Sequence, residues 1–378
     1  MIPVMKPWLG EDEARAAADV VASGWLAQGP RVAEFEAAFA ARVGAPHGVA
    51  LTSCTTGLHV ALHLLGLDPG DEVVVPSLSF IATANSAVYV GATPVFADVE
   101  PEDGNLSRRT VEAVLTDRTR AIVVVDQGGV PADVDPLREL CEERGIVLVE
   151  DAACAAGSTY RGRPVGASAT LAAWSFHPRK LLTTGEGGML TLADAGLAGR
   201  ARRLREHGMS VSAAERHRSR QPVIENYLEV GFNYRMTDIQ AAIGLVQLGK
   251  LSAMVQRRRE LAAAYQAALV DVPGVRTVRD PEWGESNFQS FWVELEPGFP
   301  VSRSDLLATL FTEGVSARAG IMAAHRQPAY AGHAHADLTT TERLTDSTLI
   351  LPLFHTMTTA EQDHVVDVMR RAATSRAA

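Results

Sequence analysis

The chain has 378 residues, which is enough for roughly two domains and a sizeable hydrophobic core. Hydrophobic residues make up 47% and charged residues 21%, the balance of an ordinary globular protein. The formal net charge of −10 argues against a nucleic acid or an anionic membrane as partner, because both favour a basic surface.

The cysteine pattern argues against a disulfide-rich or metal-binding protein. The three cysteines, Cys54, Cys141 and Cys154, form no CxxC pair and no metal-ligand spacing. Such a sparse set is typical of reduced thiols, and the start of the chain lacks the basic-then-apolar pattern of a signal peptide. No uncharged apolar run reaches the length of about 18 residues that spans a membrane. We therefore expect a cytoplasmic protein without a metal.

Along the first half of the chain, short apolar runs alternate with helix-like segments. The pattern predicts strands at residues 47–52, 71–76, 92–99, 120–126, 145–151 and 171–176. These runs are apolar almost throughout, as in a parallel sheet that is covered on both faces. Alternating strands and helices predict an α/β fold.

The pattern changes after about residue 240. Residues 237–269 read as one long helix, whose start Thr237 or Asp238 would cap. An apolar run at 288–295 and helices beginning near 302 and 358 follow, which together indicate a smaller α+β unit. We predict a large α/β domain at residues 1–250 and a small C-terminal domain at residues 251–378.

Ligands of open α/β sheets bind beyond the carboxyl ends of the strands, so the polar residues there are candidates for a site. After the first strand, residues 53–57 (SCTTG) open a helix. Small hydroxyl side chains together with the free backbone N–H groups of a helix start can bind an anion. A plain helix cap by Ser53 or Thr55 explains the same residues equally well.

Asp151 ends another buried strand, where an unpaired carboxylate would be costly. A protonated ring nitrogen would be a suitable partner, and a cap for the following residues is the alternative.

Lys180 is notable because the chain contains only three lysines, Lys6, Lys180 and Lys250, and otherwise uses arginine for positive charge. An amine forms a Schiff base with an aldehyde, whereas a guanidinium group does not. Lys180 precedes the glycine-rich residues 183–189 (TTGEGGM), which allow a backbone to approach a ligand closely. A surface lysine is the plain alternative. Together with the acid-ended strand and the anion-binding helix start, Lys180 suggests pyridoxal phosphate (PLP).

The sequence resembles the DegT-type sugar aminotransferases, a fold-type I PLP-dependent family. Seven segments in the same order carry the resemblance: residues 23–40, 53–62, 76–99, 149–166, 175–188, 229–248 and 351–366. The resemblance implies a large domain with a mostly parallel seven-stranded sheet flanked by helices, and a smaller C-terminal α+β domain.

Position by position, the resemblance also implies roles for individual residues. Lys180 matches the Schiff-base lysine, which also carries the substrate's proton, and Asp151 matches the acid that pairs with the pyridine nitrogen. The other matching residues stack on the ring, hold the phosphate or reach it from the neighbouring subunit of a homodimer: Phe80 for stacking, Thr55, Thr56 and Ser175 for the phosphate, and Asn233 from the neighbour.

Two positions depart from the family pattern. Cys154 stands where many members have Gln or His facing the cofactor's phenolic oxygen, and Gln127 is a candidate for that contact instead. Asp126 stands where His is common, which would put a negative charge near the site.

The family moves an amino group from glutamate or glutamine to a ketone, usually on a nucleotide-linked hexose and less often on a free cyclitol, in amino-sugar or secondary metabolism. We expect the substrate to meet Trp25, residues 216–220 and three basic side chains: Arg318, His325 and Arg326. For each of these three, a solvated charge on a loop is the plain alternative.

Other reactions and a non-catalytic role stay open. Sugar dehydratases of the same fold typically have His at the lysine position, so Lys180 counts against them. Dehydratases of the aminohydroxybenzoate-synthase type keep the lysine. A non-catalytic cofactor-binding scaffold is a third alternative, against which the intact set of cofactor residues argues.

Overall fold

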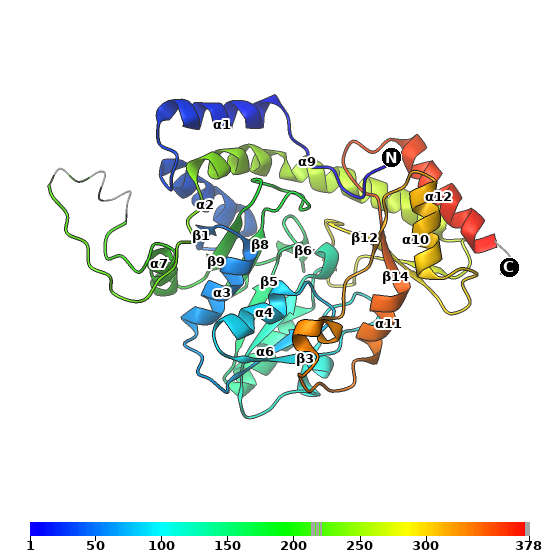
Figure 1. The fold of residues 1–378 in the computed structure, drawn as a ribbon, viewed down its shortest axis with the longest axis horizontal. Helices are drawn as coiled ribbons and strands as arrows, with labels where there is room; N and C mark the ends of the chain where they lie inside the picture. Colours follow the sequence, from blue (N-terminus) through cyan, green and yellow to red (C-terminus); the bar gives the residue numbers. More distant parts are fainter. Residues whose placement is uncertain (213–215, 217–218, 220, 375–378) are drawn as a thin grey trace.

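The computed structural model describes residues 1–212, 216, 219 and 221–374, and it is built around one large sheet (Figure 1). This sheet has seven strands in the order β1-β9-β8-β5-β4-β2-β3. The strands are β1 (His47–Leu51), β2 (Glu72–Pro76), β3 (Thr93–Ala97), β4 (Thr119–Val125), β5 (Val147–Asp151), β8 (Leu171–Ser175) and β9 (Gly188–Leu192). Six of them, all but β9, coincide with predicted strands to within two residues at each end.

The sheet is mainly parallel, as predicted. β2 pairs in parallel with β3 and β4, and the parallel ladder continues through β5 to β8. Only β9 runs against its neighbours β1 and β8. The carboxyl ends of β2, β4, β5 and β8 therefore lie along one edge of the sheet.

Helices cover both faces of the sheet. On one face, α3 (Cys54–Leu64), α4 (Ala82–Tyr89) and α7 (Ala195–Leu204) pack through a core that includes Leu58, Leu62 and Val123. On the other face lie α2 (Pro30–Val43), α5 (Arg108–Glu112), α6 (Val134–Arg144) and the start of the long helix, around Phe35, Phe39 and Trp174. Two apolar faces explain why the strands read as continuous apolar runs.

The long helix is α9 (Asp238–Leu269), and it crosses the top of the molecule beside α1 (Glu11–Ser23) (Figure 1). Thr237 caps it in a capping box with Gln240, as the sequence indicates. Its first half packs on α2, where Gly244 lies so close to the ring of Phe35 that a Cβ atom would come within 2.8 Å. Its second half enters the small-domain core through Leu261, Tyr265 and Leu269.

The C-terminal unit contains a second sheet with the order β10-β12-β14-β13. Its elements are β10 (Val275–Thr277), β12 (Phe291–Leu295), β13 (Arg318–Ala319), β14 (Thr348–Leu351), α10 (Arg303–Thr312), α11 (Thr339–Ser347) and α12 (Thr359–Thr374). A three-stranded sheet of β11 (Gly284–Glu285), β6 (Thr159–Tyr160) and β7 (Arg163–Pro164) lies between the units.

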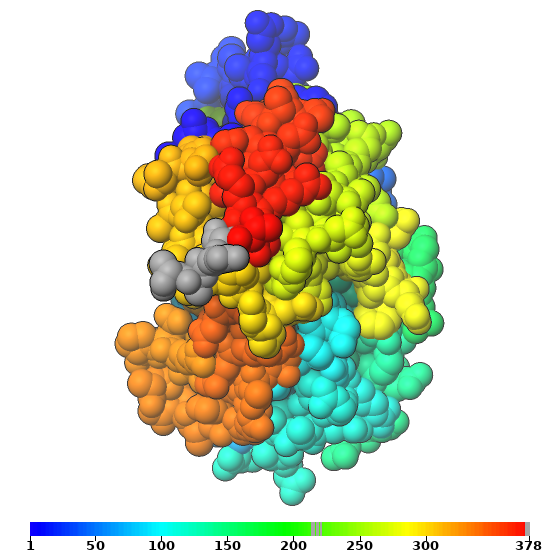
Figure 2. Space-filling model, turned by 90° about the vertical axis from the view of Figure 1, so that its right-hand side faces the viewer, coloured from blue at the N-terminus to red at the C-terminus, as the bar shows by residue number. Residues whose placement is uncertain are grey.

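The first residues of the chain join the C-terminal unit. The backbone of Ile2 bonds with Gly314, and Leu353 donates to the carbonyl of Val4. Figure 2 shows this blue N-terminal segment beside the red helix α12. A division at residue 250 remains a prediction, since α9 runs through both units without a break.

Within the described residues, no helix combines the length and the apolar character that crossing a membrane requires. Most of the expected substrate-facing segment 216–220 lies outside the described residues.

Candidate active site

The helix start at α3 offers free donors for an anion. Ser53 caps α3 and accepts from the backbone N–H of Thr56, while the Thr56 hydroxyl donates to the carbonyl of Ser53. None of the described residues accepts a hydrogen bond from the N–H groups of Cys54 and Thr55 or from the Thr55 hydroxyl. The cap and the anion site therefore coexist, because the cap uses Ser53 and leaves the first two amides of the helix open.

The glycine-rich residues bring β9 against this helix start. A Cβ atom on Gly188 would lie 2.3–2.5 Å from backbone atoms of Ser53 and Cys54, so only glycine fits there. Ser175, at the end of β8, is the Cα partner of Gly188. Among the described residues, its hydroxyl has one weak contact, from the N–H of His177 at 3.5 Å. Thr55, Thr56 and Ser175 are thus gathered at one edge of the sheet by the close approach at Gly188.

Asp151 is the last residue of β5 and is buried, with 5% of its surface exposed. Its Oδ2 accepts from the Thr83 hydroxyl at 2.8 Å, and its Oδ1 accepts from the N–H of Ala153 at 3.2 Å. Burial raises the pKa of this carboxyl, while these donors and the charge of Lys180 oppose the rise. The residues directly after Asp151 form no helix, so Asp151 does not cap one.

Lys180 follows β8 and lies partly buried beside Cys154, with 3.0 Å between Nζ and Sγ. Burial disfavours its charged form, but contacts with Cys154, Cys54 and Asp151 outweigh burial and raise the pKa of the amine. Burial and the neighbouring Asp151 raise the pKa of the Cys54 thiol well above its ordinary value. Lys180 and Asp151 are therefore brought together from the ends of two adjacent strands.

The sequence missed two members of this cluster. Thr83, one helical turn after Phe80, gives Asp151 its shortest hydrogen bond, and the Cys54 thiol lies 3.9 Å from Asp151 Oδ1. Both residues lie in segments that the sequence pattern singled out. Only their closeness in the chain to Phe80 and Ser53 indicated that they could contact Asp151.

Phe80 and Asn233 are both exposed. The ring of Phe80, just before α4, is 63% exposed and is free to stack on a ligand. Asn233 lies between α7 and α9, forms a bridge with Glu206, and its side-chain amide contacts none of the described side chains of the cluster. Its expected role across a subunit interface stays a proposal.

Asp126 follows β4 and faces away from this cluster. It pairs with Glu150, and both carboxyls are buried. Burial and the neighbouring Glu150 raise the pKa of Asp126 well above its usual range, and burial raises the pKa of Glu150 to about 7. Two carboxyl groups form a hydrogen bond with each other only when one of them is protonated. We place that proton on Asp126, because its Oδ2 accepts a hydrogen bond from no donor among the described residues. Asp126 thus carries no charge when paired.

Gln127 is buried and already engaged. Its Nε2 donates to the carbonyl of Leu78, and its N–H donates to Asn105 Oδ1 at 2.8 Å. Cys154, by contrast, points its sulfur at Lys180. Of the two departures from the family pattern, Cys154 is the one in direct contact with the lysine.

The four substrate candidates occupy different environments. Arg318 in β13 is exposed and its guanidinium has no partner among the described residues. The indole of Trp25 donates to the carbonyl of Gln28 at 3.3 Å. Arg326 is paired with Glu342 and Asp346, and His325 is buried with both ring nitrogens bonded.

The residues fit PLP on chemical grounds. Open amides and hydroxyls at α3 and β8 suit a phosphate, a buried carboxylate suits a protonated pyridine nitrogen, and an amine suits an aldehyde. Within the described part of the chain, no group of three or more His, Cys, Asp or Glu side chains is arranged to hold a metal ion.

Comparison with known proteins gives the same answer over the whole chain. The model of the DegT/DnrJ/EryC1/StrS aminotransferase family matches residues 7–370. The chain belongs to this family. It is 37% identical to the spore coat polysaccharide biosynthesis protein SpsC of Bacillus subtilis (strain 168), covering 98% of this chain and 96% of SpsC.

Solved structures agree closely in fold. The aminotransferase TlmJ from Streptoalloteichus hindustanus is 38% identical, with a TM-score of 0.91 over 98% of each chain. DesI, solved in the presence of its TDP-sugar product, is 33% identical, with a TM-score of 0.90 over 99% of this chain and 93% of DesI.

These matches confirm four expectations. The chain has the fold of the fold-type I aminotransferases, and it is a PLP-dependent aminotransferase of a sugar aminotransferase family. The individual site residues remain proposals that rest on the geometry above.

Proposed function

We propose that the enzyme transfers an amino group from glutamate or glutamine to a ketone on a nucleotide-activated sugar, with Lys180 as the Schiff-base lysine. The observation that carries the site is the cluster at the ends of β5 and β8, where a lysine amine and a buried carboxylate meet beside an open helix start. DesI, whose structure was solved with its TDP-sugar product, supports the nucleotide-linked substrate.

When bound, PLP supplies an electron sink for the substrate carbon that loses its proton. Asp151 holds the proton on the pyridine nitrogen, which its buried position and the Thr83 donor allow. Lys180 Nζ, once free, takes the proton from one carbon and returns it to the other. Thr55, Thr56 and Ser175 would hold the phosphate and Phe80 would stack on the ring, while the contact with Cys154 orients Nζ.

Arg318 and Trp25 are the substrate candidates that we favour. Arg318 has an exposed guanidinium, which suits a diphosphate or a donor carboxylate. Trp25 is partly buried near the start of α2.

We further propose a homodimer in which Asn233 reaches the partner's cofactor phosphate. The segment before Asn233 exposes large apolar side chains, which a second copy would cover: Ile224 (89% exposed), Tyr227 (64%), Leu228 (63%) and Val230 (86%). The three cysteines are free, which supports the proposed cytoplasmic location.

A half-reaction screen tests the substrate class. The protein in its pyridoxamine form is offered TDP- and UDP-linked keto sugars, keto-inositols and an aminohydroxybenzoate precursor. We expect a nucleotide keto sugar to restore the visible absorption of the aldehyde form. Discharge only by keto-inositols would favour the cyclitol alternative, and dehydration without discharge would favour the dehydratase. A cofactor spectrum that no amino donor shifts would favour the scaffold.

Mixed dimers test the shared site. Lys180→Arg and Asn233→Ala are each expected to have little activity as homodimers. If the site is shared, mixed dimers place both substitutions at one site and leave the other intact, so part of the activity returns. No recovery on mixing would contradict the shared site.

A further inference from the structure

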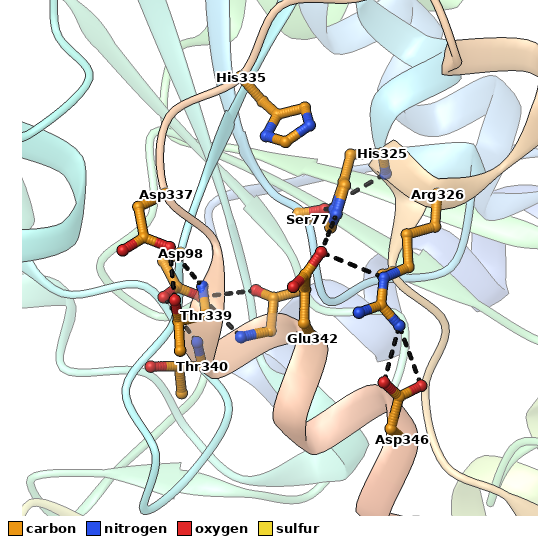
Figure 3. A network of polar contacts seen from close by, with 12 residues as sticks. Ser77, Asp98, His325, Arg326, His335, Asp337, Thr339, Thr340, Glu342 and Asp346 are labelled. Atoms are coloured by element: carbon orange, nitrogen blue, oxygen red, sulfur yellow. Dashed lines mark hydrogen bonds and ion pairs between the residues drawn. The ribbon is translucent and has the colours of Figure 1, made fainter.

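The segment between β13 and α11 is fastened to the loop that follows β2. The backbone N–H of Ala324 donates to the carbonyl of Ser77 at 2.7 Å, and Leu78 forms a bridge with Ala323. His325 adds two contacts with the Ser77 hydroxyl, one from its backbone N–H at 3.3 Å and one at Nδ1 at 2.7 Å. Figure 3 shows His325 between Ser77 and Glu342 of α11.

The contacts fix the protonation state of His325. Ser77 is fully buried, and its hydroxyl oxygen already accepts from the backbone of His325. The structure gives this hydroxyl hydrogen no acceptor other than Nδ1 among the described residues, so we assign it to Nδ1, which then carries no proton. Nε2 then carries the ring hydrogen and donates to Glu342 Oε1 at 3.2 Å. A neutral imidazole satisfies both neighbours.

The surroundings favour this neutral form. Burial lowers the pKa of His325, Glu342 opposes this effect, and His335 and Arg326 reinforce it. The ring of His335 lies 4.6 Å from that of His325, and Phe96 of β3 closes another side. Glu342 is also shared with Arg326 at 3.2 Å, which weakens its pull on the imidazole proton.

The partner helix α11 is itself held in place. Asp98, just after β3, accepts from the N–H groups of Thr340 and Thr341 at the start of the helix. Arg326 binds both oxygens of Asp346 at 2.9 Å. Glu342 therefore presents a fixed oxygen to His325 (Figure 3).

From Ser77 the same loop leads to the cofactor site. Ser79, two residues on, shares a 2.8 Å hydrogen bond with Thr83, and Thr83 donates to Asp151. Phe80, the proposed stacking ring, lies between them in sequence. Ser77, Ser79 and Thr83 are each at most 2% exposed, so these contacts are shielded from bulk solvent.

We propose that His325 is a positioning residue that holds the Ser77–Thr83 loop, and with it Phe80 and the donor to Asp151, in the geometry that binds the cofactor. The proposal rests on the proposed roles of Phe80 and Asp151. The neutral imidazole of His325 holds the loop in place and does not contact a substrate directly.

Three variants separate this role from general stability. His325→Phe keeps an aromatic ring but removes both ring nitrogens, and Ser77→Ala removes the hydroxyl on the other side. His325→Gln offers one acceptor and one donor and does not titrate. Binding of pyridoxal phosphate is measured by the visible absorption and by equilibrium dialysis, together with kcat and KM for each substrate.

We expect His325→Phe and Ser77→Ala to bind the cofactor about tenfold more weakly, with a shifted visible band and a lower kcat but an unchanged KM for the ketone. His325→Gln should restore most of the binding. Below the ordinary histidine pKa of about 6.5, the unchanged protein should lose more cofactor affinity than His325→Gln, in which only the shared dependence on the Lys180 amine remains.

A cofactor affinity and band that are unchanged in both His325→Phe and Ser77→Ala would overturn the proposal. So would a His325→Gln variant as impaired as His325→Phe. A raised KM with normal cofactor binding would instead indicate that His325 contacts the substrate directly. If Lys180 proved not to bind the cofactor at all, the proposed function would fail independently of these outcomes.

Discussion

Two buried aspartates end neighbouring strands and have opposite surroundings. Asp151 ends β5 and receives hydrogen bonds from Thr83 and Ala153, with Lys180 nearby. Asp126 follows β4, receives one bond from the N–H of Ala132 at 3.0 Å, and faces the carboxyl of Glu150. Donors and a cation favour a charged acid, whereas a second acid favours a shared proton.

The pleat of the sheet produces this difference. Val125 is the register partner of Asp151, and Val124 is that of Glu150. Since side chains alternate between faces, Asp126 shares a face with Glu150, and Asp151 points to the opposite face, where α3 begins. Two acids one strand apart thus reach different cores, and only Asp151 meets the lysine.

The largest expected effect is on kcat, and it should follow the replacement of Asp151 but not that of Asp126. Asp151→Asn should lower kcat by roughly 10²–10³-fold, because the charge that stabilises the pyridine proton is lost. Asp126→Asn should keep kcat within about fivefold, since its carboxyl is already neutral. Steady-state kinetics of both variants measure this difference. Equal losses of kcat would contradict the different roles of the two acids.

The second effect concerns stability and pH. Burial raises the pKa of Glu150 to about 7, and burial together with the neighbouring Glu150 raises the pKa of Asp126 well above its usual range, so the folded protein holds protons that the unfolded chain has lost. The stability that these protons provide is fully present below the unfolded pKa values and is lost as the pH rises through about 7. From Glu150 alone, we expect the free energy of unfolding to fall by on the order of 2–3 kcal/mol between pH 5 and pH 8.

Denaturant titrations across that range measure the loss. Asp126→Asn should reduce it by more than half, because the amide can donate to Glu150 without a proton to lose. Glu150→Gln serves as the matched variant. An identical pH dependence in all three proteins would show that the pair does not share a proton.

Much of this architecture could be predicted from the sequence, because apolar runs that stop at polar residues mark strand ends. Asp151 and the start of α3 were singled out in this way, and Lys180 by the rarity of lysine in the chain. β9 was missed because its strand begins inside the glycine-rich residues. The Ser77–His325 contact joins residues 248 apart, and no local pattern reports such a pair. Likewise, Glu150 reads as an ordinary strand residue until the register places it beside Asp126.

A third, smaller effect tests the donor to Asp151. Thr83→Val removes the hydroxyl that favours the ionised carboxyl, so the pKa of Asp151 should rise by about one unit. The acid limb of the kcat profile should move to higher pH by the same amount. Thr83→Ser, which keeps the hydroxyl, should leave the limb in place; movement in both variants would point to packing instead.

The smallest effect is expected at Cys154. Its contact with Lys180 helps to raise the pKa of the amine, so Cys154→Ala should lower that pKa by less than about one unit. The pH dependence of pyridoxal phosphate binding to the cofactor-free protein reports this change. Cys141→Ala is the control, because Cys141 lies in α6 on the other face of the sheet. A larger shift in the control than in Cys154→Ala would contradict the contact.

The covalent attachment of the cofactor is tested most directly by reducing the loaded protein with borohydride and mapping its peptides. We expect one pyridoxyl label, on Lys180, and no label in Lys180→Arg. A label on Lys6 or Lys250, or none on cofactor-loaded protein, would contradict it.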